Sequence, residues 1–376
     1  MSSKRKILFL TGTRADFGKI KSLINIVEHD ADFEVYVFVT GMHLQQEYGY
    51  TVIEIERCNF SNVHKYENQT HETTMDLTLA KTIEGLSSYC KEIQPDLIVV
   101  HGDRVETLAG AITGSLNNIL VAHIEGGELS GTVDELIRHS VSKLSHIHFV
   151  SNNEAKRRLI QMGEIDSSVY TIGSPDIDIM FSDALPTLEV AKEYYQIYFD
   201  QYAIAMFHPV TTEARDMQRY AKSFVEALSA DVHNYVIIYP NNDLGSQFIV
   251  DAYLELKDNS RFRIFPSLRF EYFLTLLKNS KFVIGNSSAG IREAPYYGIP
   301  IINIGTRQQN RSAHADIVNV GYETTEIDNA LKSIDSHEVT PQQSHFGSGN
   351  SAALFLKSLK GHRIWNLNHQ KQFKDI

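Results

Sequence analysis

The chain of 376 residues contains few cysteines and no long apolar run. Its two cysteines, Cys58 and Cys90, form neither a disulfide framework nor the spacing of a metal site. Such sparse cysteine usage is typical of proteins from a reducing compartment. No apolar run approaches the ~20 residues of a membrane-spanning helix, and the run at residues 7–10 is too short for the core of a signal peptide. The sequence therefore predicts a soluble, cytoplasmic protein.

The motifs of several common enzyme classes are missing as well. No GxGxxG follows the first expected strand, so nothing supports a dinucleotide cofactor, and no GxxxxGK[ST] marks a P-loop. Neither GxSxG nor a plausible catalytic cysteine is present. His139, His146 and His148 are crowded together, but they lack the spacing of zinc ligands. We interpret them as core or surface residues.

Basic residues are also outnumbered by acidic ones. The chain has 35 lysines and arginines against 46 aspartates and glutamates, which gives a net charge of -11. Such a balance repels polyanions and argues against nucleic acid or an anionic membrane as a partner. To bind a phosphorylated ligand, the chain must use a few well-placed cations rather than a basic field.

What the sequence does contain is a regular alternation of short apolar runs with segments of helical period. This alternation predicts a parallel, doubly wound sheet. In the first half the expected strands are residues 7–10, 35–39, 97–100, 119–123, 147–150 and 169–172. In the second half they are residues 203–207, 236–239, 263–265, 282–285 and 301–304. Because single cores stop growing at ~250–300 residues, we expect an α/β protein with two Rossmann-like domains facing one another across a cleft.

The expected domain boundaries follow from the break in this pattern near Gly173-Ser174-Pro175. We expect an N-terminal Rossmann-like domain at residues 1–175 and a C-terminal one at residues 176–350. Residues 351–376 are expected to form a helix and a tail that packs back on the body.

The stretch at residues 281–300, KFVIGNSSAGIREAPYYGIP, predicts a short buried strand that leads into a helix over residues 289–297. The candidate helix caps between them are Asn286, Ser287 and Ser288. Such a turn leaves several backbone N–H groups aimed outward, which is the geometry of a phosphate site. Glu293, about one turn further in, would accept hydrogen bonds from a sugar hydroxyl. The alternative is structural, because every α/β protein has turns of this kind.

Polar residues also follow the first and third expected strands. Arg14 comes just after the first strand and is either a surface residue or a guanidinium that binds a diphosphate through two hydrogen bonds. His101-Gly102-Asp103-Arg104 follows the third strand, and Asp103 is either a helix cap or a catalytic carboxylate. Doubly wound sheets bind ligands at the carboxyl ends of their strands. Arg14, Asp103 and Arg104 are therefore candidate site residues.

Two more carboxylates follow the fourth expected strand. Glu125 comes directly after it, and Thr132-Val133-Asp134-Glu135 has the pattern of a capping box that opens a helix through Leu144. In the first turn of that helix, the dipole would stabilise the Asp134 anion. Helix chemistry alone also explains an aspartate there. Arg138 lies four residues on, within reach of Asp134.

Each expected strand of the second half also ends in polar residues. They are His208, Asn241 with Asn242, Ser267, the cluster that begins at Asn286, and Arg307. So many polar strand ends in one half indicate a ligand site. With the other motifs absent, acid–base chemistry over a bound diphosphate remains. Its candidate residues are Asp103, Glu125, Asp134 and His208.

Seven segments, in this order, resemble those of UDP-N-acetylglucosamine 2-epimerases. They are GTRADFGKIK, HGDRVETLAG, HIEGGELSGTVDELIRHSVSKLSHIHF, GSPDIDIM, FHPVTTE, YPNND and GNSSAGIREAPYYGIPIINIGTRQ. The segment EGGELSGTVDE resembles the hydrolysing branch of bacterial sialic acid synthesis, which releases N-acetylmannosamine and UDP. The resemblance implies a two-domain fold of the GT-B type and a homodimer or a dimer of dimers.

The resemblance also implies roles for the matching residues. Arg14 and His208 would hold the diphosphate of a UDP-sugar, with Lys19 near it. Ser287 and Ser288 would cradle the same diphosphate at the start of a helix. The acid–base carboxylates would be Asp103, Glu125 and Asp134.

The nucleoside would be held by a second group of residues. Glu293 would bind the ribose hydroxyls. Phe273 would stack on uracil, with the backbone near Ser267 and Leu268 reading the edge of the base. Phe273 also fits the apolar face of its own helix, so the role is one of two interpretations. The remaining residues expected to contact the substrate are Arg104, Asn241, Asn286 and Arg307.

The implied reaction explains why carboxylates are needed. The C2 proton of the sugar has no neighbouring carbonyl, so the anomeric C–O bond must break first or concurrently. Elimination of UDP would give a glycal, which is then hydrated with inversion at C2. A carboxylate would remove the C2 proton and an acid would return one, so no metal or redox cofactor is expected.

Four other functions remain open at this point. The same chemistry could act on a UDP-2,4-diacetamido-trideoxy sugar, and residues around His43 and the loop at 126–132 would decide between the two substrates. A non-hydrolysing epimerase would return UDP-N-acetylmannosamine. A GT-B glycosyltransferase would need an acceptor, and a nucleotide-sugar sensor would bind without turnover.

Overall fold

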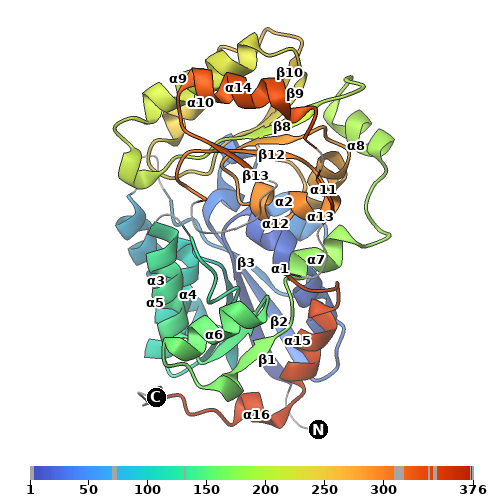
Figure 1. Ribbon diagram of the computed structural model, residues 1–376. Coiled ribbons are helices and arrows are strands. Elements are labelled where there is room, and N and C mark those ends of the chain that lie inside the picture. Colours follow the sequence, from blue (N-terminus) through green and yellow to red (C-terminus); the bar gives the residue numbers. More distant parts are fainter. Residues whose placement is uncertain are drawn as a thin grey trace. The chain divides into compact units, whose positions relative to one another are not determined.

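The computed structural model describes residues 4–69, 74–130, 133–308, 317–337, 339–341, 345–372 and 374. The chain divides into two compact units (Figure 1). Unit 1 consists of Met1–Glu128, Asp134–Ser182 and Ser344–Ile376, and unit 2 of Leu129–Val133 and Asp183–Gln343. Within the described residues, no helix is both long and apolar enough to cross a membrane.

Unit 1 contains a seven-stranded parallel sheet in the order β3-β2-β1-β4-β5-β6-β7. Its strands are β1 Arg5–Thr11, β2 Phe33–Val39, β3 Val63–Lys65, β4 Leu97–His101, β5 Leu120–Ile124, β6 Ile147–Val150 and β7 Val169–Thr171. Strands β4 and β5 are buried at every position, because helices cover both faces of the sheet. The order reverses between β1 and β4, so this unit is doubly wound.

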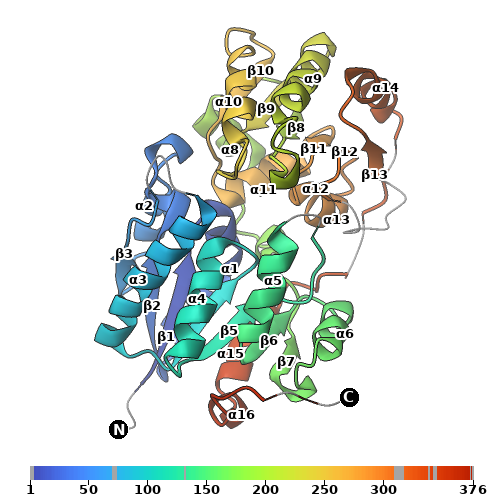
Figure 2. The same ribbon diagram turned by 90° about the vertical axis from the view of Figure 1, so that its left-hand side faces the viewer.

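The helices of unit 1 form two layers. Its helices are α1 Arg14–Glu28, α2 Val52–Glu56, α3 Met75–Ile93, α4 Val105–Leu116, α5 Val133–Leu144, α6 Asn153–Gln161, α7 Pro175–Met180, α15 Ser351–Leu359 and α16 His362–Trp365. One apolar core lies between the sheet and α1, α2, α15 and α16, and a second lies under α3, α4 and α5. Figure 2 looks onto the face that α3, α4 and α5 cover.

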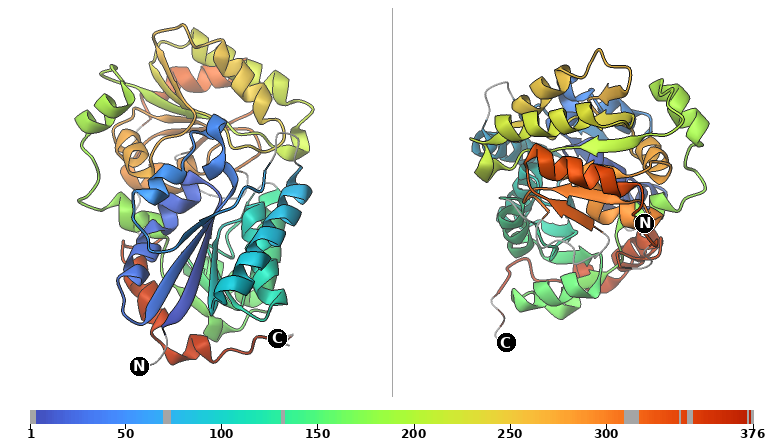
Figure 3. Two further views of the ribbon diagram at one scale, coloured as in Figure 1. Left: turned by 180° about the vertical axis from the view of Figure 1, so that it is seen from behind. Right: turned by 45° about the horizontal axis from the view of Figure 1, so that its top comes forward.

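The C-terminal segment of the chain belongs to unit 1. Phe355, Leu359 and Ile364 are fully buried in the same core as strand β1. The carboxylate of Asp178 accepts hydrogen bonds from the first two backbone N–H groups of α15. In the view from behind in Figure 3, α15 lies beside the N-terminal helix and strands of this unit.

Unit 2 repeats the same strand order with six parallel strands, β10-β9-β8-β11-β12-β13. They are β8 Ala203–Met206, β9 Tyr235–Ile238, β10 Phe262–Phe265, β11 Val283–Gly285, β12 Ile301–Ile304 and β13 Ile317–Val320. The helices are α8 Leu188–Tyr195, α9 Met217–Ala230, α10 Ser246–Leu254, α11 Phe270–Lys278, α12 Ala289–Arg292, α13 Ala294–Tyr297 and α14 Thr324–Ile334. The strand order again reverses between the first and fourth strands, here β8 and β11.

The expected fold class, two Rossmann-like α/β domains, is confirmed. Every expected strand has a counterpart whose ends differ by at most two residues. The single helix expected over residues 289–297 is wrong, because α12 and α13 are separate and Glu293 lies between them. Pro295 has no N–H group to bond to the carbonyl one turn earlier, which interrupts the helix. Gly298 ends α13 in a left-handed conformation, which glycine adopts readily at the end of a helix.

Candidate active site

Each unit has one edge at which a ligand is expected to bind. In doubly wound sheets the ligand crevice lies at the carboxyl ends of the strands, where the strand order reverses. In unit 1 this edge carries or adjoins Arg14, Lys19, Asp103, Arg104, Glu125 and Asp134. In unit 2 the strand ends and the elements after them carry His208, Asn241, Ser267, Leu268, Phe273, Asn286, Ser287, Ser288, Glu293 and Arg307.

In unit 1, Arg138 connects the two loops that carry Asp103 and Glu125. Its guanidinium donates one hydrogen bond to the Asp103 carboxylate and a second, of 2.6 Å, to the backbone carbonyl of Glu125. The two loops follow β4 and β5, which pair in parallel, so the carboxylates project from neighbouring strand ends. The Arg138 side chain is only 3% exposed. The sequence indicated Arg138 only as a neighbour of Asp134, because its partners here lie far away in the chain.

The side chain of Glu125 is held from two sides. The Ser174 hydroxyl donates a 2.8 Å hydrogen bond to one carboxylate oxygen, and His101 Nε2 lies 3.4 Å from the other. Glu125 itself has a φ of 65°, which is uncommon for a residue other than glycine. Such a backbone persists where its surroundings fix it, and it is frequent at functional sites. Ser174 and His101 were not predicted as site residues.

Asp134 lies in the first turn of α5, one turn before Arg138 on the same helix. Its position near the positive end of the helix dipole stabilises the ionised carboxylate. The predicted capping box begins at Thr132, which lies outside the described residues. Arg138 thus bonds to the carboxylate of Asp103 and to the backbone of Glu125, and its own helix carries Asp134.

The two cations predicted to lie near the diphosphate both have acidic neighbours. Arg14 is the first residue of α1, and its guanidinium Nη2 lies 3.6 Å from Oε1 of Glu54. Lys19 is nearly buried, with its ammonium 3.3 Å from the Asp176 carboxylate. A cation at a helix N-terminus is unfavourable for the helix dipole, so helix chemistry does not explain Arg14. Arg104 precedes α4.

The β1–α1 turn is bound by Asp16, which was not predicted as a site residue. His43, which contacts Thr11 from the segment after β2, was expected only to help decide between the two substrates. The Asp16 carboxylate accepts hydrogen bonds from the backbone N–H groups of Gly12 and Thr13 and from the Thr11 hydroxyl. Burial raises the pKa of Asp16. His43, fully buried between two threonine hydroxyls, has its pKa lowered to about 3 by burial and by the charge of Arg14. The amides of this turn bind their own carboxylate, so an anion would be bound here through Arg14.

In unit 2, Asn286 fixes the backbone of His208. Its side-chain amide accepts a 2.6 Å hydrogen bond from His208 N–H and donates a 2.9 Å bond to His208 C=O. The backbone carbonyl of Asn286 accepts hydrogen bonds from Arg307 at 3.2 Å and Gln308 at 2.8 Å. Asn286 is fully buried. The first, fourth and fifth strands of this sheet are therefore cross-linked at their carboxyl ends.

The ring of His208 is oriented by a backbone group. Its Nδ1 accepts a 3.0 Å hydrogen bond from the backbone N–H of Asn241. A neutral imidazole whose Nδ1 accepts carries its proton on Nε2. His208 therefore presents an N–H donor from its other nitrogen, which is suited to binding an anionic oxygen.

The β11–α12 turn approaches the backbone of β8 closely. Gly285 has a φ of 132°, and a Cβ atom at this position would lie 2.0 Å from the carbonyl oxygen of Met206. Only glycine allows this approach, which places Ser287 and Ser288 next to the strand end that carries His208. The Ser287 hydroxyl accepts a 3.3 Å hydrogen bond from the N–H of Ala289. The helix that follows has only four residues, so its dipole is small.

The residues expected to hold the nucleoside lie on two elements. Glu293 is 3% exposed at the break between α12 and α13. Phe273 is on α11, where it is buried together with Leu276 and Leu277, as the structural interpretation expected. Leu268 is buried and Ser267 half-buried in the turn before α11.

Comparison with known proteins identifies the family of the chain. The family model for UDP-N-acetylglucosamine 2-epimerase matches residues 25–360. A UDP-N-acetylglucosamine 2-epimerase from Neisseria meningitidis is 48% identical over 99% of both chains. The UDP-N,N'-diacetylbacillosamine 2-epimerase (hydrolyzing) of Legionella pneumophila is 32% identical over 95% of this chain and 96% of its own.

A solved structure supports the fold assignment independently. The UDP-GlcNAc 2-epimerase of Methanocaldococcus jannaschii, in complex with UDP-GlcNAc and UDP, has a TM-score of 0.79. It is 20% identical in sequence, and the match covers 94% of this chain and 99% of that one. The GT-B type fold that the resemblance implied is therefore confirmed. On the family model and the identity to its relatives, the chain belongs to the UDP-N-acetylglucosamine 2-epimerase family.

Proposed function

We propose that this protein is a hydrolysing UDP-N-acetylglucosamine 2-epimerase. It converts UDP-N-acetylglucosamine and water into N-acetylmannosamine and UDP, for sialic acid synthesis. The observation that carries the proposal is the pair of carboxylates at the ends of β4 and β5, joined by Arg138. Its family membership and the hydrolysing enzyme named among its relatives support the same conclusion.

The reaction has two stages in this proposal. In the first, the C1–O bond breaks, UDP leaves with the bonding electron pair, and a carboxylate takes the C2 proton, which leaves a glycal. In the second, water adds its hydroxyl to C1 while an acid delivers a proton to C2. This proton arrives on the face of the sugar opposite to the one from which the first proton was removed. The product is N-acetylmannosamine. Acid–base catalysis of this kind contributes typically ~10²–10⁴-fold to a rate.

The residues of unit 1 act on the sugar. Asp103, Glu125 and Asp134 supply the acid–base groups. Glu125 has a hydroxyl donor on one oxygen and an imidazole 3.4 Å from the other, so its carboxylate is fixed in one orientation. Arg14, Lys19 and Arg104 supply positive charge as the diphosphate leaves.

The residues of unit 2 bind UDP. His208 donates from Nε2 to the diphosphate, with Ser287 and Ser288 beside it. Preorganised donors of this kind stabilise charge that develops in the transition state, each by ~10²–10³ in rate. Glu293 accepts hydrogen bonds from the ribose hydroxyls. The remaining contacts to the nucleotide are assigned to Asn241, Ser267, Leu268, Phe273, Asn286 and Arg307.

Product analysis tests the proposal. The purified protein is incubated with UDP-N-acetylglucosamine and water alone, and nucleotide and sugar are separated by chromatography. UDP and N-acetylmannosamine in equal amounts are expected. UDP-N-acetylmannosamine would show a non-hydrolysing epimerase instead, and UDP release that requires an added sugar acceptor would show a glycosyltransferase.

A second candidate substrate is a UDP-2,4-diacetamido-trideoxy sugar, because two relatives at 30–32% identity are named for UDP-N,N'-diacetylbacillosamine. The two substrates differ at C4 and C6. Comparing kcat/KM for both sugars with the same preparation distinguishes them. We expect the N-acetylglucosamine nucleotide to be preferred, in line with the relative at 48% identity. We also propose that the protein acts as a homodimer or a dimer of dimers.

A further inference from the structure

Arg138 is a buried cation with two long-range partners. It lies in the middle of α5, and its guanidinium donates to the Asp103 carboxylate and to the Glu125 carbonyl. These partners are 35 and 13 residues away in the chain. Arginine forms two such bonds at once because its N–H groups have a fixed planar arrangement, which lysine cannot reproduce.

The position of Arg138 bears on all three proposed acid–base carboxylates. It binds that of Asp103 directly, and it holds the backbone from which the side chain of Glu125 projects. Asp134 lies one turn earlier on the same helix. Carboxylates on adjacent strand ends repel one another in a poorly hydrated site, and a buried guanidinium offsets part of that repulsion.

The backbone at Glu125 needs to be held. Its φ of 65° is unfavourable for a residue that carries a side chain, and such a backbone persists only where surrounding contacts offset the strain. Two hydrogen bonds fix it here, from Glu125 N–H to the Phe149 carbonyl at 3.0 Å and from Arg138 to the Glu125 carbonyl. Without Arg138, the Glu125 carbonyl loses this hydrogen-bond donor.

A second residue supports the Asp103 loop. His123 Nε2 lies 2.8 Å from the carbonyl oxygen of Gly102, which can only accept, so the imidazole donates to it. Burial lowers the pKa of His123 to about 3, so the ring is neutral at ordinary pH. The neutral His123 thus donates a hydrogen bond to the Gly102 carbonyl, and the charged Arg138 donates one to the Asp103 carboxylate.

We infer that Arg138 is a positioning residue for the acid–base centre, which sets where Asp103, Glu125 and Asp134 lie relative to one another. The inference rests on the proposed function. Arg138 contacts carboxylate and backbone, and no step of the reaction is assigned to it. Its loss therefore lowers the rate of the chemical steps and leaves the binding of UDP nearly unchanged, because no contact to UDP is assigned to Arg138.

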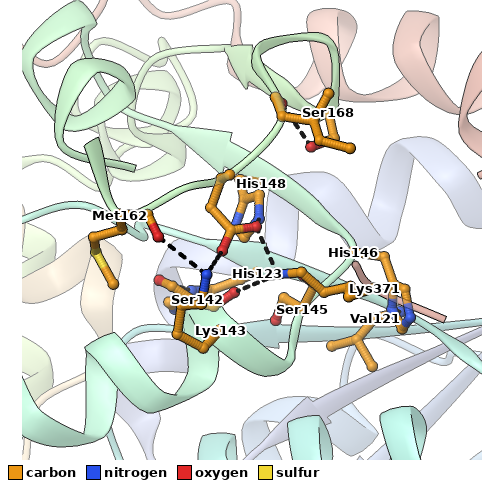
Figure 4. A network of polar contacts seen from close by, with 12 residues as sticks. Val121, His123, Ser142, Lys143, Ser145, His146, His148, Met162, Ser168 and Lys371 are labelled. Atoms are coloured by element: carbon orange, nitrogen blue, oxygen red, sulfur yellow. Dashed lines mark hydrogen bonds and ion pairs between the residues drawn. The ribbon is translucent and has the colours of Figure 1, made fainter. Parts of the chain in front are cut away.

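Helix α5 has a second anchor that provides a matched control. The ammonium of Lys371, from the C-terminal segment, donates to the carbonyls of Ser142 and Ser145 at the end of α5 and to the Glu164 carboxylate. Figure 4 shows Lys371 beside Ser142 and His148. Lys371→Met removes a partly buried cation that holds the same helix but bonds to none of the three carboxylates. It separates a loss of helix stability from a loss of positioning.

The test compares wild type, Arg138→Met, Arg138→Lys and Lys371→Met. For each, kcat and KM are measured with UDP-N-acetylglucosamine, Kd for UDP by calorimetry, and Tm by scanning calorimetry. We expect kcat to fall about 10²-fold in Arg138→Met, the scale of a misplaced catalytic group, and less in Arg138→Lys. KM and the Kd for UDP are expected to stay within about 3-fold in both. Lys371→Met is expected to lower Tm and to leave kcat within about 3-fold.

Two results would overturn the inference. One is a kcat for Arg138→Met within about 3-fold of wild type. The other is an equal fall of kcat in Lys371→Met at a similar loss of Tm, which would make Arg138 a purely structural residue. Absence of turnover by the wild type on either UDP-sugar would instead contradict the proposed function, and the inference with it.

Discussion

In unit 1 the fourth and fifth strands end in Asp103 and Glu125, whereas in unit 2 the fourth strand ends in Asn286 and the fifth in the turn that carries Arg307. Both sheets have the same strand order, and in both a side chain connects these two strand ends. The connecting cation of unit 1 binds a carboxylate as well as a backbone carbonyl, and that of unit 2 donates a hydrogen bond to a backbone carbonyl. In the proposed function, the same fold supplies acid–base groups in one unit and hydrogen-bond donors in the other.

The comparison separates binding from chemistry. In the proposed function, the carboxylates of unit 1 act on the sugar, and Arg14, Lys19 and Arg104 near the same edge supply positive charge to the diphosphate. A sheet edge with an imidazole N–H, hydroxyls and a guanidinium is suited to holding it. We therefore expect substitutions of the carboxylates in unit 1 to act mainly on kcat and substitutions in unit 2 to act also on the affinity for UDP.

The largest effect is expected for the carboxylates of unit 1. Asp103→Asn and Glu125→Gln should each lower kcat by about 10²–10⁴-fold, because each removes an acid–base group. The Kd for UDP, measured by calorimetry, should change by less than about 3-fold. Glu135→Gln, one residue after Asp134 on the same helix, is the matched control and should leave kcat unchanged. A Kd for UDP that rises along with the loss of kcat would break the proposed separation.

A smaller effect on rate, with an effect on binding, is expected for His208. His208→Ala removes the Nε2 donor and should lower kcat by about 10²-fold while weakening UDP binding. Asn286→Ala leaves the backbone N–H and C=O of His208 without their side-chain partner, which costs about 1–3 kcal/mol for a buried group. It should therefore lower Tm as well as kcat. An unchanged Kd for UDP in His208→Ala would show that His208 does not bind the diphosphate.

The smallest expected effect concerns the stability of unit 1 at low pH. Burial alone would raise the pKa of Glu164, but hydrogen bonds and the charges of His148 and Lys371 lower it to about 2, from an ordinary value of 4.5. A depressed pKa stabilises the fold above the ordinary value, and that stability is lost as the pH falls toward 2. Tm should therefore decline from about pH 4.5 downward, and Glu164→Gln should flatten that decline. An unchanged slope in Glu164→Gln would assign the acid sensitivity to other groups.

The strands could be predicted from the sequence where burial is continuous. Runs such as residues 97–100 and 301–304 are apolar throughout because both faces of a central parallel strand are covered. The two strands missed, β3 and β13, are edge strands with few fully buried positions. Residues 63–65 contain a single apolar residue, which is too few to distinguish this edge strand from a loop.

The candidate site was predictable only in part. Residues directly after a strand could be proposed as site residues, because strand ends mark the functional edge of such a sheet. The partners of these residues were not found, since Arg138 meets Asp103, and Ser174 meets Glu125, only when distant segments fold together. A rule based on spacing along a helix pointed from Arg138 to Asp134 and gave no sign of the two longer-range bonds.

The central claim is that the carboxylates of unit 1 exchange the proton at C2 of the sugar while UDP is eliminated. Proton NMR of the protein with UDP-N-acetylglucosamine in D₂O, without added metal, tests it most directly. The account predicts UDP together with N-acetylmannosamine that carries deuterium at C2. Release of UDP with N-acetylglucosamine that retains its C2 proton would contradict it.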